Sequence, residues 1–314
     1  MPKRVDPPRA RYGDPDWETD GANWPRSADS AFYGVGGFVW HVQKTGTGPI
    51  AVLLHGTGAG THSWAPLIPK LADRLTLITV DLPGHGFTQS PRAFRPSLPN
   101  MCRALQALFA ELKLQPDLII GHSAGAAIAI HLVARHRQAP RLLVSINGAL
   151  KPFDGMMRTL APTIAKMMSF GGLAARLVSR TSSGDDGVRK LIQNTGSDPE
   201  SVAISPYAKL LQRRGHIQGA LQMMAHWDLT HILEDCSKLS MPIVFISAEG
   251  DKAVPPEVSK HATRQAAFGT YFELPSLGHL AHEEDPARVA EIILNAWDRV
   301  KVKPQDTDGA KGNL

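Results

Sequence analysis

The sequence predicts an α/β fold in which a mostly parallel central sheet carries helices on both faces. Three observations predict it. Seven short, largely apolar runs occur along the chain, as expected of strands buried on both faces. Helical patterns separate most of these runs, so that strands and helices alternate. One long stretch, residues 150–235, has helical periodicity but no convincing strand, and therefore predicts a helical insertion.

Seven strands are predicted from the apolar runs. In chain order they cover residues 38–46, 47–56, 75–86, 116–123, 141–148, 241–251 and 269–279. Helical periodicity predicts helices at residues 65–72, 98–113, 124–137, 257–267 and 285–300. Pro286 suits the first turn of the last of these helices.

The insertion divides the predicted domain. Residues 150–235 separate the fifth strand from the sixth, and we expect them to form a helical lid over the carboxyl ends of the strands, where α/β proteins keep their sites. Residues 31–149 and 236–300 would then form the core. Residues 1–30 are expected to be an N-terminal arm, and residues 301–314 a flexible tail.

The composition is typical of a globular protein without disulfide bonds or membrane-spanning segments. With 314 residues, 43% of them apolar, the chain can bury a sizeable core. Cys102 and Cys236 lie far apart without metal-ligand spacing, which predicts a reducing compartment and no metal site. Because no apolar run reaches the roughly 18 residues of a membrane span, we expect a cytoplasmic protein.

Charge is unevenly distributed. The formal net charge is +5, and residues 150–230 hold ten Lys or Arg against six Asp or Glu. This excess favours an acidic ligand, a partner or peripheral contact with a membrane surface near the lid, although solvated helix faces explain it equally well. No basic run with interleaved aromatic residues appears, so no nucleic-acid partner is expected.

The segment "GHSAG" lies between a predicted buried strand and an Ala-rich helix. This pattern, G-x-S-x-G at a strand-to-helix junction, is typical of a nucleophile elbow. Gly121 and Gly125 permit the sharp turn, and the turn lifts the Ser123 oxygen above the sheet. We therefore predict that Ser123 is a nucleophile.

A serine hydroxyl needs a base to take its proton and an acid to orient that base. His279 follows the last predicted strand, and Asp251 follows the sixth, in the segments "LPSLGHLAHEEDP" and "FISAEGDKAVPP". The chain order serine, acid, histidine matches one known arrangement of such triads. We predict Asp251 as the acid and His279 as the base.

Each of these two assignments has competitors. His282 is the alternative base, although its position at a helix entrance favours a capping or solvated role. Asp235 and Glu249 are the alternative acids, and either is equally typical of an ordinary surface carboxylate.

Acyl transfer also needs donors for the oxyanion that forms on the substrate. Ala124, directly after the nucleophile, supplies one backbone N–H. The loop "HGTGAGTHSW" after the second strand supplies another, and we assign it to Thr57, which follows Gly56. The same loop does not complete G-x-G-x-x-G, so no nicotinamide or other cofactor is expected.

Candidate pocket residues come from the elbow, the oxyanion loop and the lid. They are His122, Trp64, Phe170 and Trp227, together with the paired methionines of the lid. Methionines at helical spacing more often belong to a core. His216, His226 and His231 lack metal-ligand spacing, so no metal is expected.

Together, "LLHGTGAGTHSW", "VDLPGHGFTQS", "GHSAG", "SAEGDKAVPP" and "LGHLAHEEDP" resemble the α/β-hydrolase family over about residues 30–300. Within that family, "WPRSADSAF", "WHVQKTGTGP" and "DLPGHGFTQSP" are similar to the magnesium-chelatase accessory proteins of bacteriochlorophyll biosynthesis.

This resemblance implies a role in magnesium insertion into protoporphyrin IX, with magnesium-chelatase subunits as partners. Two functions follow from the sequence. The first is a serine hydrolase that acts by acyl transfer on a small-molecule ester. The second is a non-catalytic or tetrapyrrole-binding accessory to the chelatase, for which lid cations such as Arg158, Arg176 or Arg213 would meet propionates.

Overall fold

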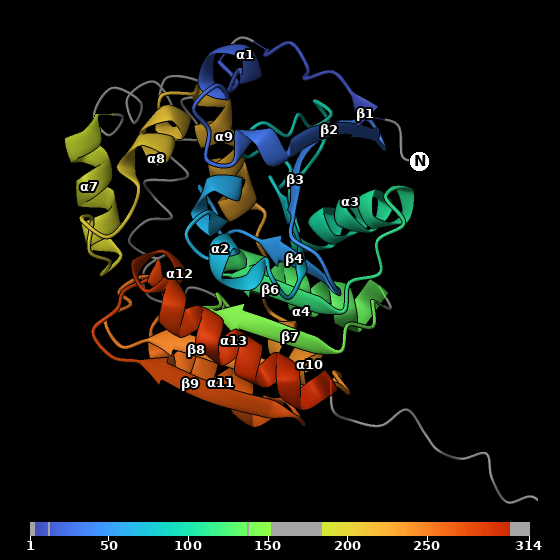
Figure 1. The fold of residues 1–314 in the computed structure, drawn as a ribbon, viewed down its shortest axis with the longest axis vertical. Helices are drawn as coiled ribbons and strands as arrows, with labels where there is room; N and C mark the ends of the chain where they lie inside the picture. Colours follow the sequence, from blue (N-terminus) through green and yellow to red (C-terminus); the bar gives the residue numbers. More distant parts are fainter. Residues whose placement is uncertain (1–3, 12, 137, 152–183, 302–314) are drawn as a thin grey trace, which may run out of the picture.

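A nine-stranded sheet runs through the molecule (Figure 1). The computed structural model describes residues 4–11, 13–136, 138–151 and 184–301. The sheet order is β1-β2-β3-β5-β4-β6-β7-β8-β9, and the strands from β5 to β9 in this order are parallel. The strands are β1 (Arg4–Val5), β2 (Ser30–Val35), β3 (Phe38–Thr45), β4 (Ile50–Leu54), β5 (Thr76–Val80), β6 (Leu118–His122), β7 (Leu142–Ile146), β8 (Ile243–Ala248) and β9 (Gly269–Leu274).

Helices cover both faces of this sheet, which confirms the predicted fold class. Alternate residues of β4 separate the two apolar layers: Val52 and Leu54 pack in one, Ala51 and Leu53 in the other. The first layer includes α3 (Leu98–Glu111), α4 (Ala124–His136), α10 (Ile232–Ser237) and α11 (Pro256–Gln265). The second includes α2 (Ile68–Leu71), α12 (Ala281–Glu284) and α13 (Pro286–Lys301), of which α13 begins at Pro286 as expected.

The described part of the insertion, residues 184–235, contains no strand. Helices α7 (Asp185–Asn194), α8 (Ile204–Leu211) and α9 (Arg214–Ala225) lie together beyond one end of the sheet (Figure 1). Helix α9 contacts the loops that follow β4 and β5, at the carboxyl ends of the strands. Helix α10 instead packs on α4 of the core, through Asp235.

The first thirty residues contain more regular structure than an arm. Strand β1, helix α1 (Trp17–Asp20) and the 3₁₀ turn η1 (Ser27–Asp29) lie there. Strand β2 extends the sheet by pairing with β3 in antiparallel register. β1, α1 and η1 have only two to four residues each, so they are too short for hydrophobic periodicity to predict them.

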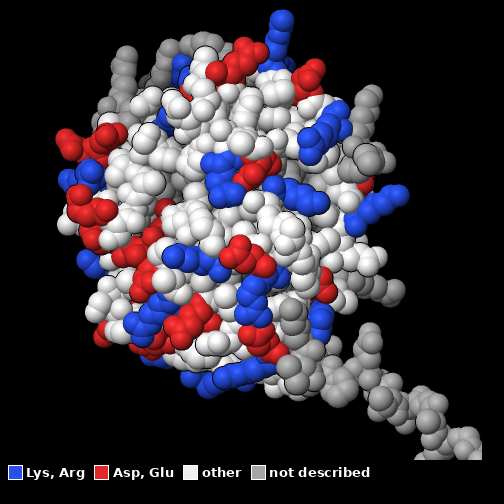
Figure 2. Space-filling model, viewed as in Figure 1, with Lys and Arg blue, Asp and Glu red and all other residues white. Residues whose placement is uncertain are grey.

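Charged side chains of both signs are interspersed over the face seen in Figure 2. Three of the four excess positive charges expected in the insertion lie outside the described residues, and Lys151 is the fourth. Residues 184–230 hold equal numbers of each sign: Arg189, Lys190, Lys209, Arg213 and Arg214 against Asp185, Asp186, Asp198, Glu200 and Asp228. Within the described ranges, no helix is both long and apolar enough to cross a membrane.

Candidate active site

The turn at Ser123 joins β6 to α4 in a conformation that L-residues rarely adopt. Ser123 has a φ of 52°, in the left-handed region. A Cβ on Gly125 would lie 2.0 Å from the Leu54 carbonyl oxygen, and one on Gly121 would lie 2.4 Å from the carbonyl oxygen of Gly125. Both glycines are therefore required by the close approach of α4 to the strands. Held strain of this kind is frequent at functional sites.

His279 and Asp251 form a buried hydrogen bond of 2.7 Å between Nδ1 and Oδ2. The other carboxylate oxygen of Asp251 accepts hydrogen bonds from the backbone N–H groups of Ala253 and Val254, each at 2.8 Å. Since a carboxylate can only accept, His279 Nδ1 carries the proton, and Nε2 is left as a proton acceptor.

The structure separates the competing acids from this histidine. Asp235 accepts hydrogen bonds from His131 and Arg135 on α4, on the first face of the sheet. Glu249 accepts a 3.4 Å hydrogen bond from the Ser276 amide. Of the three carboxylates considered, Asp251 is the one hydrogen-bonded to His279.

The competing base is enclosed in the core. His282 is 0% exposed, and its Nε2 lies 2.9 Å from the Ser63 hydroxyl. Burial lowers the pKa of His282 to about 3. Its ring centroid lies 4.4 Å from that of His122, with the two ring planes tilted by 43°.

No hydrogen bond joins Ser123 to His279 among the described residues. In unliganded enzymes such bonds are often loose and tighten with substrate. Ser123 is held instead by its backbone: its N–H donates to the Ile146 carbonyl, and its carbonyl accepts from Ala126 and Ala149.

Two residues fix the loop that carries His279. His122 donates from Nε2 to the His279 carbonyl at 2.8 Å, and Asn147 donates to the same oxygen at 2.8 Å. Asn147 also accepts from the Ala248 amide, so it ties the ends of β7 and β8 to this loop. Sequence reasoning missed Asn147, although an Asn directly after a strand, at a φ of 45°, is typical of a turn position.

The segments that carry the predicted oxyanion donors are next to Ser123. A Cβ on Gly56 would lie 3.0 Å from the Ser123 Cβ, so the loop after β4 lies directly against Ser123. Ala124 begins α4, and a first helical N–H has no acceptor within its own helix. Within the described part of the chain, no acceptor meets the Thr57 N–H, and the Thr57 hydroxyl contacts Met223 Sδ at 3.6 Å.

The candidate pocket residues have different surroundings. Trp64 is 0% exposed in the second core layer, and His122 is 2% exposed beneath His279. Both are packed in the interior, because neighbouring core side chains enclose them. Trp227 is half-buried against the first layer. Phe170, Arg158, Arg176 and the first two methionine pairs lie outside the described residues.

The histidines of the insertion have ordinary partners. His216 bridges two backbone groups, His226 bonds the Gln222 carbonyl, and His231 lies 3.3 Å from Glu234. Among the described residues, no group of three or more His, Cys, Asp or Glu could hold a metal ion.

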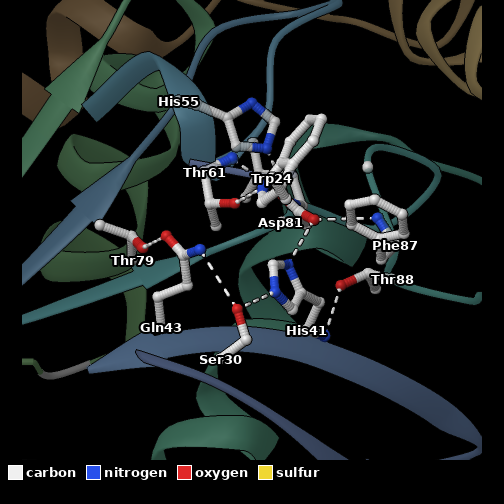
Figure 3. Close-up of polar contacts among 12 residues, drawn as sticks. Trp24, Ser30, His41, Gln43, His55, Thr61, Thr79, Asp81, Phe87 and Thr88 are labelled. Carbon is white, nitrogen blue, oxygen red and sulfur yellow. Dashed lines mark hydrogen bonds and ion pairs between the residues drawn. The ribbon is translucent and has the colours of Figure 1, made fainter. Parts of the chain in front are cut away.

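A buried carboxylate organises the loops around this site (Figure 3). Asp81, at the end of β5, accepts hydrogen bonds from the His41 ring at 2.7 Å, the Thr61 amide at 2.7 Å and the Phe87 amide at 2.9 Å. His41 in turn lies 2.9 Å from the Ser30 hydroxyl. These bonds keep the pKa of Asp81 far below its usual range, against the opposing effect of burial. Asp81 thus fixes the loops after β4 and β5 relative to each other.

Comparisons with known proteins agree with this architecture. The chain is 36% identical over 276 residues to the magnesium-chelatase 30 kDa subunit of Rhodobacter capsulatus, covering 87% of this chain and 96% of that protein. It is 29% identical over 238 residues to the pimeloyl-[acyl-carrier protein] methyl ester esterase of Xylella fastidiosa, covering 73% of this chain and 86% of that protein. A putative lipase from Acinetobacter baumannii has the same fold, with a TM-score of 0.73 at 19% identity over 87% of this chain and 91% of that one. The model of the alpha/beta hydrolase family matches residues 51–292, and the chain belongs to this family.

Proposed function

We propose that the protein is a serine hydrolase that cleaves an ester-type substrate by acyl transfer. The observation that carries the proposal is the buried hydrogen bond between Asp251 and His279, beside a serine held at a strained strand-to-helix turn. This arrangement supports the assignment of a base, an orienting acid and a nucleophile to these three residues.

The reaction would proceed in two halves. Ser123 Oγ attacks the ester carbonyl while His279 Nε2 takes the hydroxyl proton, and Asp251 stabilises the imidazolium that forms. The N–H groups of Thr57 and Ala124 donate to the oxyanion. His279 then gives its proton to the departing alkoxide, which leaves as an alcohol. Water, activated by the same histidine, releases the acid and restores Ser123.

Labelling with a fluorophosphonate probe tests the proposal directly. We expect the wild-type protein to be labelled and the Ser123→Ala and His279→Ala variants to remain unlabelled, since the probe reacts only with an activated serine. Ser240→Ala, at an exposed serine ahead of β8, is the matched control and should label as the wild type does. Absence of label on a folded wild-type protein would contradict the proposal.

We propose in addition that the protein serves magnesium insertion into protoporphyrin IX, acting with magnesium-chelatase subunits at the membrane surface or in the cytoplasm. The similarity that supports this spans 96% of the Rhodobacter capsulatus subunit. The alternative within this proposal is a non-catalytic, tetrapyrrole-binding role.

Complementation separates the two roles. In a Rhodobacter capsulatus strain that lacks its 30 kDa subunit, we expect the wild-type gene to restore pigment and the Ser123→Ala gene to fail, because the proposed role uses chemistry at Ser123. Restoration by both genes would favour the binding role. Restoration by neither, with both proteins present in the cells, would contradict the chelatase proposal.

A further inference from the structure

We propose that His216, on helix α9 of the insertion, is a positioning residue for the oxyanion loop, defined here as residues 55–60. The inference rests on the proposed hydrolase function, because the loop carries Thr57. It assigns a role in the reaction to a helix that supplies none of the reacting groups.

His216 bridges two core loops with its two ring nitrogens. Nε2 donates to the Gly58 carbonyl at 3.1 Å, and Nδ1 accepts from the Gly86 amide at 3.1 Å. A carbonyl can only accept and an amide N–H can only donate, so the ring is neutral with its proton on Nε2. The side chain is 1% exposed. The bond to Gly86 is therefore buried, and the bond to Gly58 is partly buried.

His55, in the core, makes the same pair of bonds with the roles of its two ring nitrogens exchanged. His55 donates from Nδ1 to the Gly56 carbonyl at 2.8 Å and accepts from the Leu82 amide at Nε2, at 2.9 Å. Each ring thus joins a carbonyl of the oxyanion loop to an amide of the loop after β5. The two anchored carbonyls, those of Gly56 and Gly58, lie on either side of Thr57.

Because the peptide bond is planar, the hydrogen bond to the Gly56 carbonyl also fixes the direction of the Thr57 N–H. The Gly56 carbonyl and the Thr57 N–H belong to one planar, trans unit, so a fixed carbonyl direction fixes the opposite direction of the N–H. His216 fixes the next anchored unit, Gly58–Ala59. Gly58 has a φ of +79°, a conformation with few steric limits for glycine. A hydrogen bond within the loop, from the Ala59 amide to the Gly56 carbonyl at 3.2 Å, closes the turn, and the bonds from His55 and His216 attach this turn to the rest of the protein.

The backbone of α9 is shaped to bring His216 to this position. A Cβ on Gly219 would lie 1.9 Å from the Gly84 carbonyl oxygen, so helix and loop meet backbone to backbone. On the other side, the Gly215 amide donates to the Gly13 carbonyl at 2.8 Å. Met223, one turn after Gly219, contacts the Thr57 hydroxyl. Helix α9 is therefore fixed on both sides, and His216 is held at the loop.

Three substitutions of His216 remove its two hydrogen bonds separately or together. Gln places an N–H donor near the position of Nε2 and preserves the bond to Gly58, Asn places an acceptor near Nδ1 and preserves the bond to Gly86, and Leu removes both. We expect His216→Leu and His216→Asn to lower kcat on para-nitrophenyl butyrate by about 10- to 100-fold, with KM within about twofold, since a misplaced donor weakens the transition state alone. His216→Gln should recover kcat to within about threefold of the wild type.

Hydrogen exchange of the amides at residues 55–60 provides a readout that is independent of catalysis. We expect about tenfold faster exchange in His216→Leu, because this loop loses an anchor to the core. His226→Gln, at the exposed end of the same helix, is the matched control and should change neither measurement.

The outcomes separate the inference from the proposed function. Unchanged kcat and unchanged exchange in a folded His216→Leu protein would overturn the inference. It would also be overturned if the Gln and Leu variants lost kcat equally and in proportion to their loss of folding stability. If the wild-type protein hydrolyses no ester and takes no fluorophosphonate, the proposed function fails. Exchange then decides whether His216 holds the loop.

Discussion

Asp251→Asn is expected to lower kcat for ester hydrolysis by about 10⁴-fold while leaving the protein folded. The amides of Ala253 and Val254 both donate to Asp251 Oδ1, so an Asn side chain will place its oxygen there and its NH₂ group against His279. An NH₂ group can only donate, and His279 Nδ1 must then give up its proton and accept. The proton moves to Nε2, where the ring can no longer take a proton from Ser123.

Asp235→Asn is the matched control for this experiment. Asp235 is also buried and also lies 2.7 Å from a histidine Nδ1, that of His131. We expect Asp235→Asn to lower the free energy of unfolding, since it weakens the pairing with Arg135, but to leave kcat within about threefold of the wild type. Steady-state kinetics and urea unfolding at neutral pH measure the two effects. Equal kcat in both variants would remove Asp251 from the mechanism.

The second large effect is expected on stability in acid. Burial lowers the pKa of His62 and of His282 to about 3 and that of His216 to about 4, and it also lowers those of His55, His85 and His122. In the unfolded chain these side chains take up protons near pH 6.5. Below that pH the unfolded state binds more protons than the folded state, so stability falls until the folded pKa values are reached.

The magnitude follows from the number of these groups. Each contributes up to about 1.4 kcal/mol per pH unit in this window. Glu283 has the opposite effect. Burial raises its pKa to about 7, although hydrogen bonds from Ser63 and Tyr207 lower it. Between about pH 7 and its unfolded pKa of about 4.3, the folded state therefore binds one proton more than the unfolded state at this residue. Since domains have about 5–15 kcal/mol of stability, we expect the protein to unfold between about pH 6 and pH 4.5. Urea titrations followed by circular dichroism across this range measure the slope.

His62→Phe tests the cause of this acid sensitivity. Neither ring nitrogen of His62 has a hydrogen-bond partner among the described residues, and its ring makes edge contacts with Trp24 and Tyr207 that a phenyl ring can also make. As the pH falls below 6.5, the free energy of unfolding of the variant should decrease by about 1.4 kcal/mol per pH unit less than that of the wild type. His226→Phe, at an exposed site, should leave the slope unchanged. An unaltered slope in His62→Phe would mean that His62 is not among the groups that cause acid unfolding.

The sequence predicted the sheet because its central strands are buried on both faces. Strands such as β4 and β7 consist almost entirely of apolar residues, and this pattern is visible without a structure. The same holds for the turn at Ser123, which needs glycines at fixed spacing. The partnership of Asp251 with His279 remains a prediction about catalysis, although the two side chains are hydrogen-bonded.

Other features depend on contacts that no local pattern records. His216 meets Gly58 across 158 positions of sequence, and a lone histidine on a helix gives no sign of such a partner. Asn147 acts through carbonyl and amide groups that every residue possesses. Trp64 illustrates the opposite error, since its place beside the oxyanion loop suggested a pocket whereas its side chain points into the core.

The packing of the first thirty residues has a consequence for how the chain folds. The Trp24 ring donates to the Thr61 hydroxyl, the Gly13 carbonyl accepts from Gly215, and Asp20 pairs with Arg213. This segment is synthesised before its partners, and two of the three, Gly215 and Arg213, follow about two hundred residues later. Contacts so distant in sequence form slowly, and domains larger than about 150 residues commonly populate intermediates. The amino terminus will therefore dock only after the insertion is complete, and until then Trp17 and Trp24 remain accessible to chaperones and proteases.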